Sequence, residues 1–288
     1  MKNSKALFHD FVHRITLPES KEEIRSLTYV IFDHVFALSR TDLLADKVIP
    51  VSDDQRQRLE EIVQRVNAHE PVQYILGEAE FYGRAFTVDR SVLIPRPETE
   101  ELVREVLEFM DRKQPSLKTI TVMDVGTGSG CIPITLKLER PKAEVLATDI
   151  SAEALMVAQQ NAERLGANVR FIRNDILTEE ISANDLDIVV SNPPYIAARE
   201  KEQMQPNVVK FEPHLALFVP ENDPLIFYKA LAVKAAKALR PSGMLCVEIN
   251  ERFGKEVSAL FVEAGFNRVS VVKDLNGKDR IVKGFKIN

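Results

Sequence analysis

The sequence predicts an α/β protein in which a small N-terminal helical bundle and a linking β-hairpin precede a doubly wound, mostly parallel sheet. Apolar residues recur at helical spacing from about residue 4 to 69, whereas strand-like and helical segments alternate from residue 119 onward. Between these regions, proline and glycine punctuate a hairpin-like stretch at residues 80–88. We therefore expect a helical domain over residues 1–70, a linker and hairpin over 71–96, and the sheet domain over 97–288.

Composition narrows the class of protein before any motif is considered. The 288 residues suffice for one large or two ordinary domains, and 45% hydrophobic and 28% charged residues are ordinary for a globular protein. A net charge of -5 argues against stable binding of long nucleic acid through its phosphates. No apolar run of membrane-spanning length and no signal-peptide pattern is found, so we expect a cytoplasmic protein without membrane contact. Cys131 and Cys246 stand in apolar segments without a Cys/His cluster, which predicts two buried thiols and no metal site.

The first part of the chain reads as helices, with no convincing strand between residues 4 and 69. One helical face is formed by apolar residues of the segment 24–35, and a second helix follows the capping residue Ser52, with Gln55 three positions on. The pattern does not separate a bundle that grips a partner from one that only packs as a lid.

The second part alternates strands with helices. The stretch 93–100 runs into a helix whose first turn holds Pro97, Glu98 and Glu100, as suits a helix N-terminus, but this does not explain Arg96 between two prolines. The last two strands are joined by Asn276-Gly277, which predicts an antiparallel hairpin at one edge. Strands are expected at 119–125, 144–149, 169–173, 186–191, 244–249, 268–273 and 280–287, and helices at 131–139, 152–165, 225–239 and 254–264.

A glycine-rich loop, Gly126-Thr127-Gly128-Ser129-Gly130, closes the first of these strands just before a helix. Glycines there let the backbone approach a ligand closely. Cys131 occupies the position where the dinucleotide fingerprint requires its last glycine, and the Lys-Ser/Thr ending of a phosphate loop is absent. Asp149 ends the next strand, where an acid can bind ribose hydroxyls. A glycine loop and an acid without phosphate-binding features fit S-adenosylmethionine.

Two further acids lie where the ends of neighbouring strands should meet. Asp124 ends the first strand and could face the loop or the methionine part of such a cofactor. Asp175 follows the third strand, where the adenine should lie, with Ile176 as an apolar contact. For each of these acids, and for Asp149, the alternative is a helix cap or a turn former.

The stretch Asn192-Pro193-Pro194-Tyr195 follows the buried strand 186–191. Each proline fixes its own φ and keeps the preceding residue out of the helical region, so the carbonyls of Asn192 and Pro193 stay available as acceptors. With the Asn192 side chain and the flat ring of Tyr195, they suit a planar group that carries N–H donors on a weakly nucleophilic nitrogen. The alternative is an ordinary turn after a strand.

Together these segments resemble the release factor glutamine methyltransferases (PrmC, also called HemK). The most diagnostic match is Ile94–Glu100, while the Asn-Pro-Pro-Tyr stretch alone is shared with amino-directed adenine methyltransferases. Two stretches depart from the family pattern, 218–224 and 250–253, and leave the details of nearby loops open. The matching residues are 70–77, Phe81, Gly83, 93–100, 126–130, 149–151, 192–196, 273–275, Gly277, Asp279 and Arg280.

The resemblance implies a class I S-adenosylmethionine-dependent fold with a seven-stranded Rossmann-like sheet. It implies methylation of the side-chain nitrogen (N5) of the glutamine in the Gly-Gly-Gln motif of peptide-chain release factors, with the N-terminal helices contacting that substrate and the enzyme acting as a monomer. The expected catalytic residues are Asn192, Pro193, Pro194 and Tyr195, and these with Arg96 are expected to bind substrate. The expected cofactor-binding residues are Gly126, Thr127, Gly128, Ser129, Gly130, Asp149, Ile150, Asp175, Ile176 and Asn192.

Three rival functions are weaker. An adenine-N6 methyltransferase is disfavoured by the acidic sequence and the lack of a basic, aromatic-rich recognition segment. A non-enzymatic docking subunit is disfavoured because the glycine loop, Asp149 and the Asn-Pro-Pro-Tyr stretch are all intact. A nucleotide-dependent oxidoreductase is disfavoured by Cys131.

Overall fold

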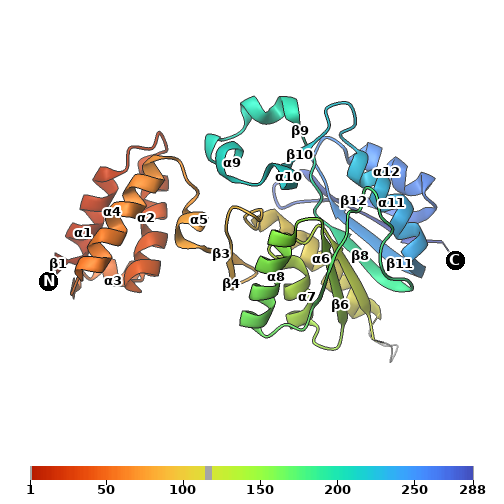
Figure 1. Ribbon diagram of the computed structural model, residues 1–288, viewed down its shortest axis with the longest axis horizontal. Helices are drawn as coiled ribbons and strands as arrows, with labels where there is room; N and C mark the ends of the chain where they lie inside the picture. Colours follow the sequence, from red (N-terminus) through yellow and green to blue (C-terminus); the bar gives the residue numbers. More distant parts are fainter. Residues whose placement is uncertain (1, 114–118, 288) are drawn as a thin grey trace. The chain divides into compact units, whose positions relative to one another are not determined.

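A computed structural model describes residues 2–113 and 119–287, which divide into two compact units (Figure 1). Unit 1 comprises the chain up to Glu78 together with Gln205–Phe211, and unit 2 comprises Ala79–Met204 and the chain from Glu212 onward. Unit 1 is therefore assembled from two separate stretches of sequence. The outer ends of the predicted domains, Met1 and Asn288, lie outside the described residues, and the assignment of residues 1–70 to substrate recognition stays a prediction.

Unit 1 is a helical bundle with an aromatic core. Ser20, Ser39 and Ser52 each begin a helix with a capping box, in which the hydroxyl accepts from the backbone N–H three residues on. Phe32 packs edge-on against Phe8 and Phe11, with ring centroids 5.4 and 5.6 Å apart. The helices are α1 (Ser4–Arg14), α2 (Lys21–Phe36), α3 (Arg40–Leu44), α4 (Asp53–Asn67), α5 (Val72–Leu76) and α9 (Pro206–Phe211).

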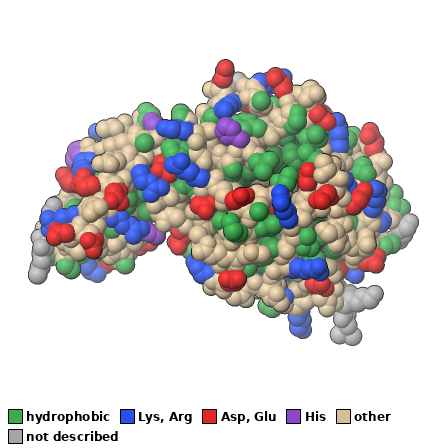
Figure 2. Space-filling model, in the orientation of Figure 1, with side chains coloured by type: hydrophobic (Ala, Val, Ile, Leu, Met, Phe, Trp, Pro, Cys, Tyr) green, Lys and Arg blue, Asp and Glu red, His purple; other side chains and the backbone are tan. Residues whose placement is uncertain are grey.

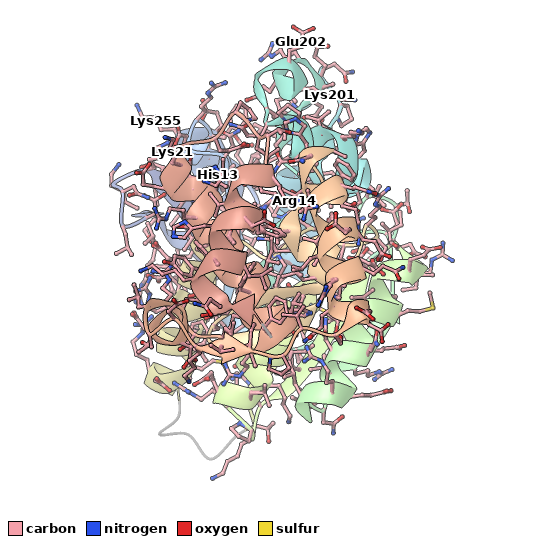
Figure 3. All side chains as sticks on the ribbon, turned by 90° about the vertical axis from the view of Figure 1, so that its left-hand side faces the viewer. His13, Arg14, Lys21, Lys201, Glu202 and Lys255 are labelled. Atoms are coloured by element: carbon pink, nitrogen blue, oxygen red, sulfur yellow. The ribbon has the colours of Figure 1, made fainter. Side chains whose placement is uncertain are left out.

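Charged side chains join these helices on the outside of the bundle. Arg14, in the last turn of α1, forms an ion pair with Glu60 of α4; Figure 3 labels Arg14 at the end of its helix. Arg65 of α4 donates to both carboxylate oxygens of Glu70 at 2.7 and 2.9 Å, and to the carbonyls of Tyr74 and Ile75 at 3.3 Å. This guanidinium fixes the course of the chain from α4 into α5.

Two features of this region differ from the sequence prediction. Val48–Ile49 (β2) pairs antiparallel with Lys2–Asn3 (β1), so the expectation of no strand before residue 69 is wrong. Each strand is only two residues long, too short for an alternating pattern to reveal it. The predicted linker also contains the short helix α5, which ends at Gly77 with φ +77°.

The predicted hairpin is confirmed. It consists of β3 (Glu78–Phe81) and β4 (Arg84–Thr87). Tyr82 and Gly83 between them have φ of 52° and 69°, the pair of positive values that a tight primed turn requires. Phe81 and Phe86 are fully buried and pack edge-to-face, with ring centroids 6.1 Å apart.

Unit 2 is built on a seven-stranded sheet in the order β12-β13-β11-β8-β5-β6-β7. All neighbours are parallel except those of β13, which runs antiparallel between β11 and β12. The predicted edge hairpin is thus β12 and β13. The strands are β5 (Thr121–Val125), β6 (Glu144–Asp149), β7 (Arg170–Arg173), β8 (Leu186–Ser191), β11 (Leu239–Glu248), β12 (Phe266–Lys273) and β13 (Asp279–Lys286).

Helices cover both faces of this sheet (Figure 1). Alternate strand residues point to opposite sides, as Val122 and Met123 illustrate: the first packs with α6, α7 and α8, the second with α11 and α12. Every residue of β8 is buried, as expected for a central strand covered on both faces. The helices are α6 (Pro97–Lys113), α7 (Cys131–Glu139), α8 (Ala152–Leu165), α11 (Ile226–Ala238) and α12 (Gly254–Glu263).

The chain between residues 196 and 219 was not predicted to hold elements, yet it forms several short ones. Ile196–Ala197 (β9) pairs in parallel with Phe218–Val219 (β10). Between them lie a 3₁₀ helix at Ala198–Gln203 (η1), α9 of unit 1, and α10 (His214–Leu217). The first departure from the family pattern, 218–224, therefore begins with β10.

Several composition-based expectations can be compared with the structure directly. Cys131 and Cys246 are both buried and free, and burial raises the pKa of Cys131 to about 12. None of the helices in the described ranges is long and apolar enough to cross a bilayer. Within residues 2–113 and 119–287, no group of three or more His, Cys, Asp or Glu residues could hold a metal ion.

Candidate active site

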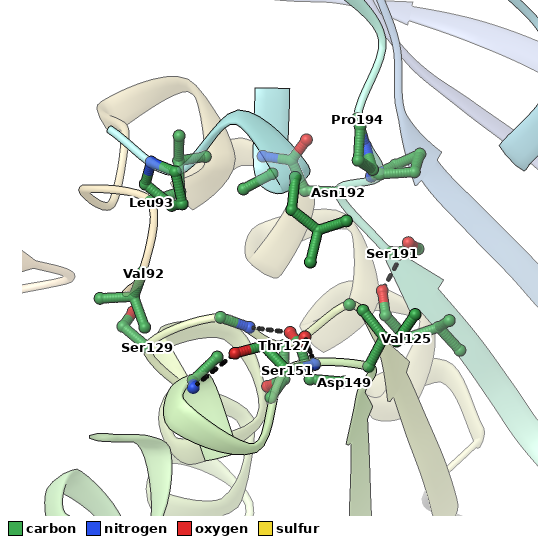
Figure 4. A pocket seen from close by; sticks show the side chains of 18 of the residues that line it. Val92, Leu93, Val125, Thr127, Ser129, Asp149, Ser151, Ser191, Asn192 and Pro194 are labelled. Carbon is green, nitrogen blue, oxygen red and sulfur yellow. Dashed lines mark hydrogen bonds between the residues drawn. The ribbon is translucent and has the colours of Figure 1, made fainter. Parts of the chain in front are cut away.

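A cavity of about 450 Å³ opens where the strand order of unit 2 reverses. In the strand order, β6 and β7 lie on one side of β5, whereas β8 and β11 lie on its other side. Ligands of open α/β sheets bind in this crevice, outside the carboxyl ends of the strands. Figure 4 shows Asn192 and Pro194 on one side of the cavity, and Thr127, Ser129 and Asp149 on the other. Figure 2 shows hydrophobic side chains gathered on the displayed face of unit 2, with charged side chains around them.

The predicted glycine loop forms the floor of the cavity. Gly126 and Thr127 donate their backbone N–H groups to the Thr148 carbonyl at 2.8 and 2.9 Å, which fixes the loop to the end of β6. Gly130 has φ +79°, and a β-carbon there would approach Ile134 Cδ1 to 2.9 Å. Because the positive φ disfavours a side chain and Ile134 and Ala158 leave little space for one, glycine is favoured at the start of α7. Four of the five residues of the predicted loop line the cavity, and Gly130 is the exception.

Asp149 ends β6 and lines the same floor. Its carboxylate accepts from the backbone N–H of Gly128 at 2.9 Å and of Ser151 at 3.0 Å. Partial burial raises its pKa, and these backbone hydrogen bonds oppose the increase. A carboxylate oxygen offers two acceptor lone pairs, so this group can still receive hydroxyl donors from a ligand.

Asp124 lies beneath the loop, fully buried, and not among the residues that line the cavity. Neither of its carboxylate oxygens, nor the Thr127 hydroxyl, has a hydrogen-bond partner among the described residues. Burial raises the pKa of Asp124 to about 7; the neighbouring Thr127 hydroxyl opposes this and the Asp149 charge adds to it. Buried acceptors without partners are uncommon in native proteins and indicate that a ligand or water completes the site.

The residues predicted to contact adenine all line the cavity, but Asp175 has a local task as well. Its two carboxylate oxygens accept from the Leu177 backbone N–H at 2.9 Å and the Thr178 hydroxyl at 2.8 Å, so the carboxylate organises the turn after β7. Ile150 and Ile176 present apolar side chains to the cavity, with Ile150 39% and Ile176 8% exposed.

The Asn-Pro-Pro-Tyr stretch follows β8 on the opposite side of the cavity. Asn192, Pro193 and Pro194 line it. Tyr195 does not: its ring is half-buried against the core beside α11 and α12, and its hydroxyl points to Glu248 Oε1 at 3.4 Å. Burial and the Glu248 charge hold the pKa of Tyr195 well above its usual value. The structure therefore places the two prolines and the asparagine, but not the tyrosine, at the cavity wall.

Two residues that the sequence analysis did not single out complete this wall. Asn192 Nδ2 donates to Thr99 Oγ1 at 3.0 Å, and Thr99 donates to Glu248 Oε2 at 2.7 Å. Glu248 is 1% exposed, and burial raises its pKa to about 7. The only sequence signals for them were the position of Thr99 in the family-like segment 93–100 and that of Glu248 near the end of the predicted strand 244–249.

Arg96 lines the cavity and is held by another residue that had no predicted role. Its guanidinium donates to Glu212 Oε1 at 2.5 Å, and the other oxygen of Glu212 accepts from the Ile94 backbone N–H at 3.4 Å. The Glu212 side chain is 1% exposed and that of Arg96 34%. The pair connects the proline-rich stretch before α6 with the chain that enters α10, and it fixes Arg96 at the edge of the cavity.

Comparison with known proteins identifies both parts of the chain. Residues 15–77 match the family model of the PrmC N-terminal domain, and residues 105–211 match that of the methyltransferase small domain. Two solved structures share the fold: a methyltransferase from Pyrococcus furiosus (TM-score 0.51, 16% identity, 82% of this chain and 100% of that chain) and the hMettl16 catalytic domain in complex with a 3′UTR hairpin (TM-score 0.56, 15% identity, 85% of each chain).

Relatives of known name are much more similar in sequence. A release factor glutamine methyltransferase from Flavobacterium psychrophilum is 40% identical over 95% of each chain. Proteins of the same name from Bacteroides thetaiotaomicron and Bacillus subtilis are 43% and 42% identical, over 91% and 85% of this chain and 92% and 85% of theirs. These alignments span both units, the cavity and the Asn-Pro-Pro-Tyr stretch, and the chain is a member of the release factor glutamine methyltransferase family.

Proposed function

We infer that this protein transfers a methyl group from S-adenosylmethionine to the side-chain nitrogen of the glutamine in the Gly-Gly-Gln motif of peptide-chain release factors. The observation that carries the inference is the cavity at the strand-order reversal. One of its walls carries a glycine loop and Asp149, and the other carries Asn192 and two prolines. Membership of the release factor glutamine methyltransferase family, over most of the chain, then selects the acceptor.

The residues of the floor suit S-adenosylmethionine. A cavity of about 450 Å³ lies in the range of small-molecule sites. Asp149 would accept the ribose hydroxyls, Ile150 and Ile176 would pack against the adenine, and the glycine loop would pass beneath the methionine part. The buried, unpartnered carboxylate of Asp124 below the loop suits the positive charge of the ammonium group, through water or at longer range. When bound, the cofactor supplies an electrophilic methyl group on a sulfonium.

The opposite wall would bind the acceptor amide. The nitrogen of a primary amide is a weak nucleophile because its lone pair is delocalised, so positioning matters more than proton abstraction. Asn192 Oδ1 and the Pro193 carbonyl would accept its two N–H bonds and hold the nitrogen toward the methyl group. They would also stabilise the positive charge that develops on the nitrogen as the bond forms. The proton then leaves to water, since the Asn-Pro-Pro-Tyr stretch offers no strong base.

We further propose that unit 1 recognises the release factor and that Arg96 contacts the substrate beside the glutamine. The match of residues 15–77 to the PrmC N-terminal domain supports the first proposal. The position of Arg96 at the cavity, fixed by a buried partner, supports the second.

The test is methyl incorporation from labelled S-adenosylmethionine into a purified release factor. We expect label in the wild-type factor and none in a factor whose motif glutamine is replaced by alanine. Double-stranded and single-stranded DNA and RNA serve as parallel substrates, because the Asn-Pro-Pro-Tyr stretch is also typical of adenine methyltransferases. Label in nucleic acid but not in the release factor would overturn the proposal in favour of that rival. Failure to bind S-adenosylmethionine at all would revive the docking subunit.

A further inference from the structure

The wall formed by Asn192, Pro193 and Pro194, here called the acceptor wall, is joined to a hydrogen-bonded network whose members come from distant parts of the chain. Thr99 belongs to the first turns of α6, Glu248 ends β11, and Asn192 and Tyr195 follow β8. Thr99 and Glu248 are 3% and 1% exposed, and neither is explained by the predicted cofactor or substrate contacts. Thr99 contacts the cavity, whereas Glu248 lies one layer behind it.

The chemistry of this network determines which way the Asn192 amide faces. The Thr99 hydroxyl has one hydrogen, and Glu248 Oε2 takes it at 2.7 Å. Only a donor can then face the remaining lone pairs of Thr99, so the contact at 3.0 Å must be made by Asn192 Nδ2. The amide oxygen Oδ1 is consequently turned away from Thr99 and is left for another donor.

The Glu248 carboxylate has further neighbours from other parts of the chain. The Tyr195 hydroxyl donates to Glu248 Oε1 at 3.4 Å. The positive charge of Arg280 from β13 favours the ionised form of Glu248, whereas the charge of Glu98 in α6 opposes its ionisation.

Arg280 is fixed by Asp274, which accepts from the Arg280 Nε and Nη2 groups at 3.2 and 3.0 Å. Asp274 also accepts from the backbone N–H groups of Asn276 and Lys278, both at 2.9 Å. The family-like stretch 273–280 thus supports the acceptor wall although it lies outside the cavity lining.

We propose that Thr99 and Glu248 are positioning residues that lock the Asn192 amide with its oxygen toward the acceptor nitrogen. The inference rests on the proposed function, because that oxygen is assigned to the acceptor N–H. Without the lock, the amide can rotate and present Nδ2, a donor, to a nitrogen that carries only donors. A neutral Glu248 has the same effect, because it can donate to Thr99 and free the Thr99 hydroxyl to donate to Asn192 Oδ1.

The first test compares two substitutions of Thr99. Thr99→Val keeps the shape and removes the hydroxyl, and Thr99→Ser keeps the hydroxyl. We expect Thr99→Val to lower kcat about 10–100-fold, in the range of other residues that orient a functional group, with the Kd of S-adenosylmethionine changed less than about 2-fold. Thr99→Ser should recover most of the wild-type kcat. Thr135→Val, at a buried threonine of α7 that does not line the cavity and whose hydroxyl has no hydrogen-bond partner among the described residues, is the control for the change of side chain alone.

The results that overturn the proposal are specific. If the kcat of Thr99→Val equals that of Thr135→Val, the Thr99 hydroxyl does not position the amide. The same conclusion follows if the kcat of Thr99→Ser is as low as that of Thr99→Val. A loss of kcat that follows the loss of thermal stability across the three variants would assign Thr99 a packing role only.

A second measurement does not depend on the identity of the substrate. The side-chain N–H signals of Asn192, identified by their disappearance in Asn192→Ala, report the amide directly in the free protein by NMR. We expect slow hydrogen exchange of the N–H that faces Thr99 in the wild type, and exchange at least about 10-fold faster in Thr99→Val and Glu248→Gln. Equal exchange in all three would overturn the lock even if the release factor is methylated. If exchange is slow in the wild type and fast in both variants, the lock is supported even if the methyl acceptor is not the release factor.

Discussion

The floor of the cavity and the acceptor wall opposite it are built by different means. The centre of the floor consists of the glycine loop and the Asp149 carboxylate: four of the five loop residues and Asp149 lie within 24 positions of one another along the chain, and N–H groups of the loop close onto the end of β6. The acceptor wall depends on side chains, with a hydrogen bond between residues 93 positions apart and another between residues 149 apart. A surface of the first kind binds through shape and local geometry, whereas one of the second kind depends on the alignment of separate elements. Substitutions should therefore separate binding from turnover according to the wall they affect.

The largest effect should come from the acceptor wall. Asn192→Ala removes the proposed acceptor oxygen, and we expect kcat to fall about 10³-fold, as when one electrostatic partner of a transition state is deleted. The Kd of S-adenosylmethionine, measured by calorimetry, should change little. Asn222→Ala, at an exposed asparagine outside the cavity lining, is the control for the substitution type. Near-normal turnover by Asn192→Ala would remove Asn192 from the scheme.

The floor should show the opposite behaviour. Asp149→Ala removes the acceptor for the ribose hydroxyls and should raise the Kd of S-adenosylmethionine about 10–100-fold, as for the loss of charge-assisted hydrogen bonds. The kcat at saturating cofactor should change much less. Asp175→Ala should have a smaller effect on Kd, because both oxygens of that carboxylate are engaged in their own turn. If Asp175→Ala raises the Kd of S-adenosylmethionine as much as Asp149→Ala does, the predicted difference between the two acids is wrong.

The charge of Glu248 gives the acceptor wall a pH dependence of its own. Burial raises the pKa of Glu248 to about 7, and the groups that face it are Thr99, Tyr195, Glu98 and Arg280. Since we expect the ionised form to be active, kcat should fall about 10-fold from pH 8 to pH 6.

Glu248→Gln separates this titration from that of Asp124, whose pKa is also about 7. The variant should have a low kcat that changes little between pH 6 and 8. A Glu248→Gln profile that falls as steeply as the wild type would assign the titration to another group.

The smallest effect concerns stability alone. Asp124 binds its proton more tightly in the folded state, with a pKa of about 7, than in the unfolded state, where the ordinary value is 3.8. Its contribution to the free energy of unfolding therefore decreases as pH rises from about 4 to 7. Asp124→Asn should raise the free energy of unfolding at pH 8 by about 1–4 kcal/mol and change it little below pH 3.5. Urea denaturation without cofactor at the two pH values measures this, and an equal effect at both would contradict the assignment of the cost to an unpaired charge.

The sequence predicted best what is encoded locally. The helices at 131–139 and 152–165 and the strand at 186–191 have the predicted bounds, because each is a periodic or continuous apolar segment with clear ends. The glycine loop was equally accessible, since positive φ values favour glycine whatever the tertiary context.

Prediction failed where a feature depends on distant partners. The β1–β2 pair joins residues 2–3 with 48–49, and neither segment has a strand pattern of its own. Thr99 looked like one residue of a capped helix and Glu248 like the end of a strand, and only the fold brings them to Asn192. The direction of the Tyr195 ring, toward the core rather than the cavity, follows from the same buried contacts.

The split composition of unit 1 has a consequence for synthesis on the ribosome. Because Gln205–Phe211 belongs to this unit, its last helix leaves the ribosome only after β5, β6, β7 and β8 of the other unit. Domains commonly fold in order from the N-terminus as the chain grows. Here unit 1 cannot be completed in that order, because β5, β6, β7 and β8 have already been synthesised when its last segment arrives. The last segment of unit 1 can therefore join the N-terminal part of that unit only after these four strands have left the ribosome.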